Sequence, residues 1–156
     1  MDKIAVFPGS FDPFTIGHES IAHRALGLFD KIIIAVGHND SKKSSFSLES
    51  RLAMINDVFG NHERIEITHF NDLTVEFCRQ RKANFIIRGL RTSADFEYER
   101  AIAQVNRVMY AEVESVFILT LPEHTSINSS IVREILRYGG DVTQFMPSAI
   151  DLKKYT

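Results

Sequence analysis

The chain has 156 residues, of which 44% are hydrophobic and 24% charged, which is the size and composition of one globular domain with a real core and excludes a disordered protein. Its formal net charge of −2 lacks the basic excess of a nucleic-acid-binding protein, so any anionic partner should be small and locally held. We find no signal peptide and no run of about eighteen apolar residues, so we expect a cytoplasmic protein with no membrane partner.

Five short β-branched and apolar runs predict strands, and stretches with helical spacing separate them. The runs are Lys3–Phe7, Lys31–Val36, Arg64–Thr68, Asn84–Arg88 and Ser115–Leu119. The run "KIIIAV" is almost continuously apolar, as expected where helices cover both faces of a parallel sheet. The sequence therefore predicts a doubly wound, Rossmann-like α/β domain with a five-stranded parallel sheet and helices on both faces.

Three helical features complete the predicted fold. Tyr98, Ile102, Val105 and Met109 form one apolar stripe. A C-terminal helix should begin at about residue 147, because proline is favoured at the first helical position. The single cysteine, Cys78, lies in an amphipathic stretch and is expected to be a buried, inert thiol.

In such sheets, ligands bind beyond the carboxyl ends of the strands, where the stretch "PGSFDPFTIGH" follows the first predicted strand. Thr15 can cap a helix whose first turn holds Gly17 and His18, and the start of a helix favours an anion such as phosphate. Ser10 adds a hydroxyl, and Gly9 and Gly17 would let a bulky ligand approach. The motif alone leaves open a capped helix with a surface histidine.

Cationic side chains occur in two further loops at the same edge. Lys42 lies in "HNDSKKSSF", which is either a solvated patch or part of an anion site. Arg88 and Arg91, close to Gly89, suit bidentate binding of phosphate oxygens. From its position alone, Glu99 is interpreted as an exposed helix carboxylate.

A second helix start follows the last predicted strand. Ser129 and Ser130 open an apolar-striped helix that should end near Tyr138, and they are either caps or part of a second anion site. Two helix starts at one edge of a sheet suggest a ligand with several phosphates. The six histidines show no compact metal-ligand spacing, and the first loop lacks G-x-G-x-x-G, so a metal site and a dinucleotide-binding oxidoreductase are both disfavoured.

The strings "GSFDPFTIGH", "SKK", "RGLR", "FEYE" and "INSSIVRE", in this order, resemble the nucleotidyltransferase superfamily and, within it, the bacterial phosphopantetheine adenylyltransferases. The resemblance runs from Lys3 to about Pro147. It implies a single nucleotidyltransferase domain over residues 1–156 that transfers an adenylyl group from ATP to 4′-phosphopantetheine, giving dephospho-coenzyme A and pyrophosphate. It also implies Mg²⁺ on the nucleotide, inhibition by coenzyme A and a homohexamer that is a trimer of dimers.

The resemblance also assigns roles to residues. His18 would stabilise the pentavalent α-phosphorus, Lys42 and Arg88 would hold the phosphate of phosphopantetheine, and Ser10 would contact both substrates. The backbone around Thr74 would line the pantetheine arm. The matching ATP-binding positions are Ser10, Phe11, His18, Gly89, Leu90, Arg91, Glu99, His124, Thr125, Ser126, Ile127, Asn128, Ser129 and Ser130.

Three positions depart from the family pattern. Ser10 replaces a common threonine, Asn128 a common serine and His124 a common aromatic residue. Two alternatives to the predicted reaction remain. One is an adenylyltransferase for another acceptor, such as nicotinamide mononucleotide. The other is a non-catalytic module that senses adenine nucleotides and would not need Lys42 or Arg88.

Overall fold

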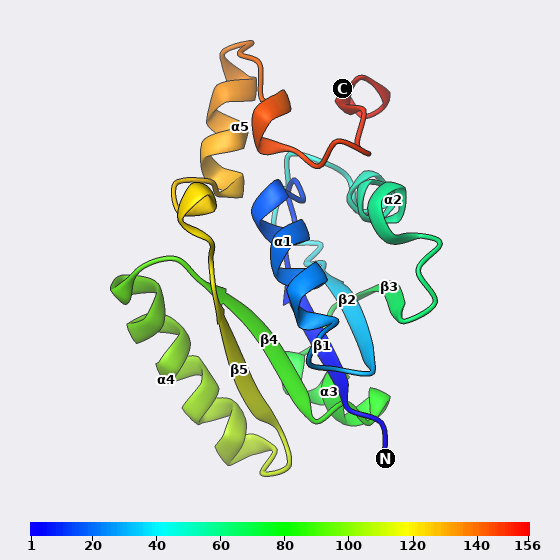
Figure 1. Cartoon of the computed structure of the whole chain (residues 1–156), viewed down its shortest axis with the longest axis vertical. Coiled ribbons are helices and arrows are strands. Elements are labelled where there is room, and N and C mark those ends of the chain that lie inside the picture. The colour runs from blue at the N-terminus through cyan, green and yellow to red at the C-terminus, as the bar shows by residue number, and fades with distance from the viewer.

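The computed structural model describes residues 1–156, which form a parallel sheet of five strands in the order β3-β2-β1-β4-β5 (Figure 1). The strands are β1 (Ile4–Gly9), β2 (Lys31–Gly37), β3 (Ile65–Phe70), β4 (Phe85–Leu90) and β5 (Glu114–Leu119). The helices are α1 (Ile16–Ala25), α2 (Leu48–Phe59), α3 (Thr74–Arg81), α4 (Ser93–Met109) and α5 (Ser129–Arg137). The predicted doubly wound α/β fold is confirmed. None of the helices has both the length and the hydrophobicity that a bilayer-spanning segment needs.

The sheet separates two apolar clusters, because successive residues of a strand point to opposite faces. Phe7 joins a cluster of 22 buried residues that includes side chains of α1, α2 and α5. Its neighbour Val6 joins a cluster of nine, which includes α3. Cys78 is buried there, and burial raises the pKa of its thiol to about 12, in agreement with the predicted inert role.

Helix α4 differs from the other helices because its predicted apolar stripe is not core. Tyr98 is 69% exposed and Val105 56%, and Glu99 is the only buried residue of the helix. The helix lies alongside β5 at the edge of the sheet (Figure 1), where Phe96 packs edge-on against Phe117. The stripe is therefore a solvent-facing apolar surface of the single chain.

The C-terminal segment corrects the sequence analysis. No helix begins at about residue 147, and the segment after α5 instead contains two short 3₁₀ turns, Thr143–Phe145 and Leu152–Lys154. The larger apolar cluster buries three side chains of this segment, those of Val142, Met146 and Ile150. Their spacing by four residues resembles that of a helix, but packing against the core determines the local conformation.

Candidate active site

Two cavities that share part of their lining lie at the carboxyl ends of the strands. The larger has a volume of about 800 Å³ and the smaller about 280 Å³. Both are lined by Ser10, which follows β1, and by Arg88 of β4. The chain proceeds from β1 to β2 and β3 and then crosses to β4, so the β1–β4 boundary is the topological switch point where sheets of this type bind ligands.

His18 lines the smaller cavity, and the start of α1 fixes its orientation. The backbone N–H of Thr15 donates to Nδ1 of His18 over 2.9 Å, and the Thr15 side chain caps the helix in return. Burial, with the charges of Arg88 and Arg91, lowers the pKa of His18 to about 3. The ring is therefore neutral at pH 7, and since Nδ1 accepts a hydrogen bond, the single ring proton lies on Nε2. His18 is a fixed hydrogen-bond donor.

Phe11 supports this imidazole, and Gly9 makes room for Phe11. The Phe11 ring lies 5.0 Å from the His18 ring, edge to face. A Cβ atom at Gly9 would come within 2.9 Å of the Phe11 ring. Gly9 also lines both cavities, so its predicted role in ligand approach stays a prediction, and its missing side chain in addition accommodates an aromatic side chain of the chain itself.

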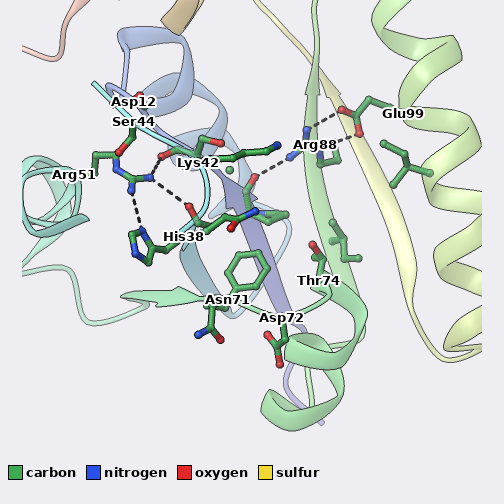
Figure 2. Close-up of a pocket in the computed structure, with 18 of the residues that line it drawn as sticks. Asp12, His38, Lys42, Ser44, Arg51, Asn71, Asp72, Thr74, Arg88 and Glu99 are labelled. Carbon is green, nitrogen blue, oxygen red and sulfur yellow. Dashed lines mark hydrogen bonds and ion pairs between the residues drawn. The ribbon is translucent and has the colours of Figure 1, made fainter. Parts of the chain in front are cut away.

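Arg88 is held by the end of β1 and by α4. Its Nε and Nη2 donate to the Glu99 carboxylate over 2.9 and 2.7 Å, and Nη1 donates to the Pro8 carbonyl over 2.8 Å (Figure 2). One N–H on each of Nη1 and Nη2 remains for an anion. Glu99 is 8% exposed, so its interpretation as an exposed helix carboxylate is wrong. It is buried because it pairs with Arg88.

Lys42 lies across the larger cavity from β4, in the loop between β2 and α2. Its side chain is exposed and points toward Arg88 (Figure 2). Thr74, at the start of α3, lines the same cavity. Ser10, Lys42, Thr74 and Arg88 therefore share one cavity although they lie far apart in the sequence.

The start of α5 forms another wall of the smaller cavity, to which Ile127, Asn128 and Ser129 contribute. The helix cap is Asn128, whose side chain accepts the N–H of Ile131 over 2.9 Å, and not a serine. The Ser129 hydroxyl donates to the Pro13 carbonyl over 2.8 Å, which ties this helix to the loop after β1.

The predicted ATP positions divide into two groups. Phe11, Gly89, Arg91 and Glu99 line the smaller cavity with Ser10, His18 and the three residues at the start of α5. The structure does not place five others on its wall, namely Leu90, His124, Thr125, Ser126 and Ser130. Gly89 and Leu90 belong to β4 rather than to the loop after it.

Sequence reasoning missed three charged residues at the site. Arg133 lines both cavities and donates to the Asp12 carbonyl over 2.8 Å. Asp12 and Arg51 are both buried beside the larger cavity. One signal was available: Arg51 lies three and four residues before the buried Met54 and Ile55, so this cation falls on the apolar face of a helix.

The fold and the paired cavities with their cationic walls define a nucleotidyltransferase of the cytidylyltransferase-like family, whose model matches residues 6–135. The chain is 47% identical over 150 residues to the phosphopantetheine adenylyltransferase of Cytophaga hutchinsonii, covering 96% of this chain and all of that protein. It is 47% identical over 148 residues to that of Phocaeicola vulgatus, covering 95% and 97%. The chain belongs to the phosphopantetheine adenylyltransferase family, which confirms the resemblance in its motifs.

A more distant solved structure has the same fold. It is a bifunctional NMN adenylyltransferase/ADP ribose pyrophosphatase from Francisella tularensis, with a TM-score of 0.72 and 21% identity. The match covers 98% of this chain, which spans about half of that protein (47%). At this identity the likeness concerns the fold alone.

Proposed function

We propose that the smaller cavity binds ATP, that the larger binds 4′-phosphopantetheine, and that the adenylyl group is transferred where the two meet. One observation supports this most strongly: Ser10 and Arg88 line both cavities, with His18 on the smaller side and Lys42 on the larger. A phosphate oxygen of the acceptor forms a bond to the α-phosphorus of ATP, and the bond to the β-phosphate breaks. The products are dephospho-coenzyme A and pyrophosphate.

The side chains match the electrostatics of this reaction. Two anions must approach one another, and the transition state spreads negative charge over the oxygens of the transferred group. Lys42 and the two remaining N–H groups of Arg88 attract the acceptor phosphate. The Nε2–H of His18 donates to a nonbridging oxygen of the α-phosphate as charge develops there. The attacking phosphate is already a nucleophile, so the reaction needs no covalent intermediate with the enzyme.

Magnesium enters this proposal on the nucleotide. The chain has no group of three His, Cys, Asp or Glu side chains placed to hold a metal ion. Phosphate oxygens are ligands that Mg²⁺ prefers, so ATP itself would carry the ion and lessen the charge of the leaving pyrophosphate. A cytoplasmic location, where ATP and Mg²⁺ are available, is part of the same proposal.

Inhibition by coenzyme A and assembly into a homohexamer also remain proposals that rest on the family resemblance. Coenzyme A combines an adenine nucleotide with a pantetheine arm, so it could occupy both cavities at once. The apolar stripe of α4 supports assembly, since Val105 is 56% exposed and Val108 87%. Light scattering of the purified chain measures the oligomeric state, and a monomer would contradict the hexamer.

Pyrophosphate release provides the direct test of the reaction. The protein is incubated with ATP, Mg²⁺ and either 4′-phosphopantetheine or nicotinamide mononucleotide. We expect pyrophosphate and dephospho-coenzyme A with 4′-phosphopantetheine. With nicotinamide mononucleotide we expect no release of pyrophosphate. Release only with nicotinamide mononucleotide would favour the other adenylyltransferase, and no release with any acceptor would favour a nucleotide-sensing module.

A further inference from the structure

The loop of residues 38–47, between β2 and α2, carries Lys42 and is largely exposed. Within it, the Lys42 N–H donates to the Asn39 carbonyl over 3.0 Å, which makes a local turn. A turn of this kind shapes the loop but does not place it relative to the sheet. Two buried side chains outside the loop do so.

Asp12 holds the end of the loop that leads into α2. Its carboxylate is 6% exposed and accepts the backbone N–H groups of Ser45 and Phe46 over 2.9 and 2.8 Å. Both bonds are charge-assisted and therefore stronger than bonds to a neutral acceptor. The segment after β1 is thus joined directly to the lysine-bearing loop.

Arg51 of α2 holds the same loop at both ends and joins it to Ser10. Its side chain is 2% exposed and donates to the carbonyls of Gly37, at the end of β2, and Phe46 over 3.3 and 3.2 Å. It also donates to the Ser10 carbonyl over 2.8 Å. Figure 2 shows Arg51 and Asp12 on the side of the larger cavity opposite Glu99. A single guanidinium therefore connects three segments that meet at the cavities.

The charges of Asp12 and Arg51 are costly to bury, so their burial needs a physical explanation. A buried ion is retained only with a full set of partners, and neutral groups can join loops at lower cost. Between Ser10 and Asp12, Phe11 has a φ of 48°, a left-handed conformation that is strained for a residue with a side chain. The Ser10–Asp12 turn is thus held in an unfavourable conformation where Arg51 and Asp12 act.

We propose that Asp12 and Arg51 are positioning residues that hold the Lys42 loop against the Ser10–Asp12 turn, so that Lys42 and Ser10 meet the acceptor phosphate together. This inference rests on the proposed function, because it assigns to the pair an effect on acceptor use. Neither side chain takes part in the chemistry. Their charges organise backbone carbonyls and amides beside a site that receives anions.

The test uses Arg51→Lys, which keeps the charge but cannot reach all three carbonyls, and Asp12→Asn. We expect each to lower kcat/KM for 4′-phosphopantetheine about tenfold while KM for ATP changes less than about twofold. In a Lys42→Ala background, the same substitutions should lower kcat/KM for the acceptor by a smaller factor than in the wild type, because the part of their effect that passes through Lys42 is already lost. Equal losses in both backgrounds would overturn the proposal.

Hydrogen exchange of the Ser45 and Phe46 amides, which join the loop to Asp12, is measured without substrates and gives a readout that does not depend on the reaction. It should accelerate in both variants and stay unchanged in Arg64→Met, the matched control. Arg64 donates to the carbonyls of Leu26 and Phe29 over 3.1 and 3.3 Å, away from the cavities. Unchanged hydrogen exchange in Arg51→Lys and Asp12→Asn would overturn the proposal, even if the wild-type protein proved inactive. An inactive wild-type protein, together with faster exchange in the two variants, would contradict only the proposed function. If Arg51→Lys does not fold, Asp12→Asn decides.

Discussion

The two cavities differ in how firmly their polar groups are held. In the smaller one, His18 is half-buried and fixed by the Thr15 amide, and Ser129 is bonded to the loop after β1. In the larger one, Lys42 is an exposed side chain on a loop. Fixed donors favour stabilisation of a transition state, whereas an exposed cation favours capture of a charged ligand. Substitutions on the two sides should therefore affect different kinetic constants.

The largest effect is expected at His18. His18→Ala should lower kcat by about a hundredfold or more with little change in ATP affinity, because the donor acts mainly on the transition state. Steady-state kinetics and ATP titration by calorimetry measure the two quantities. His23→Ala is the matched control, since His23 is an exposed residue on the same helix. Turnover of His18→Ala near that of the control would reject the role of His18.

Arg88→Ala should act chiefly on the larger cavity. We expect it to weaken binding of 4′-phosphopantetheine about tenfold or more, because two charge-assisted bonds to the phosphate are lost. Calorimetry with the acceptor alone measures the Kd. The double variant Arg88→Ala/Glu99→Ala controls for the buried carboxylate that the single change leaves unpaired. Recovery of normal affinity in the double variant would show that Arg88 itself contributes nothing to acceptor binding.

Glu99→Gln should separate the charge of Arg88 from its orientation. Without the carboxylate, the charge of Arg88 is no longer compensated but its side chain is less firmly held, so both KM for the acceptor and kcat should fall, by about threefold to fivefold. Initial rates at varied acceptor concentration give both constants. A raised acceptor KM with unchanged kcat would instead mean that Glu99 contributes only to acceptor binding.

The smallest effect is expected from pH. With a folded-state pKa of about 3, His18 should stay neutral from pH 8 to pH 5, and its NMR ring signals should not move, whereas in urea they should titrate near 6.5. Because the folded-state pKa is the lower one, unfolding takes up a proton, and the stability that His18 contributes above pH 6.5 declines as the pH falls toward 3. Movement of the folded-state signals near pH 6.5 would contradict this.

Local patterns sufficed for the sheet and for several groups in the cavities. Strands such as β2 are continuous apolar runs, and Thr15 with His18 forms a cap within four residues of sequence. Glu99 could not be predicted as buried, because its environment depends on how α4 lies against Arg88, eleven residues away. The same holds for Arg51, whose partners come from three distant segments, although its place on an apolar helix face was visible.

In the C-terminal segment, a local pattern predicts a helix that does not form. Proline at position 147 and apolar residues at intervals of four suit a helix, yet the segment follows the core surface in turns. The α4 stripe shows that periodicity predicts a helix without saying what its apolar face contacts.

The hydrogen bond from the Thr15 amide to His18 serves both the stability of helix α1 and the orientation of the His18 ring. At many active sites, groups placed for chemistry weaken the fold, and evolution trades stability against activity. Here Nδ1 of His18 accepts the hydrogen bond from the Thr15 amide at the start of helix α1. The same hydrogen bond leaves the proton of the ring on Nε2. Selection for a firmer helix and selection for a better aligned donor therefore favour the same side chain.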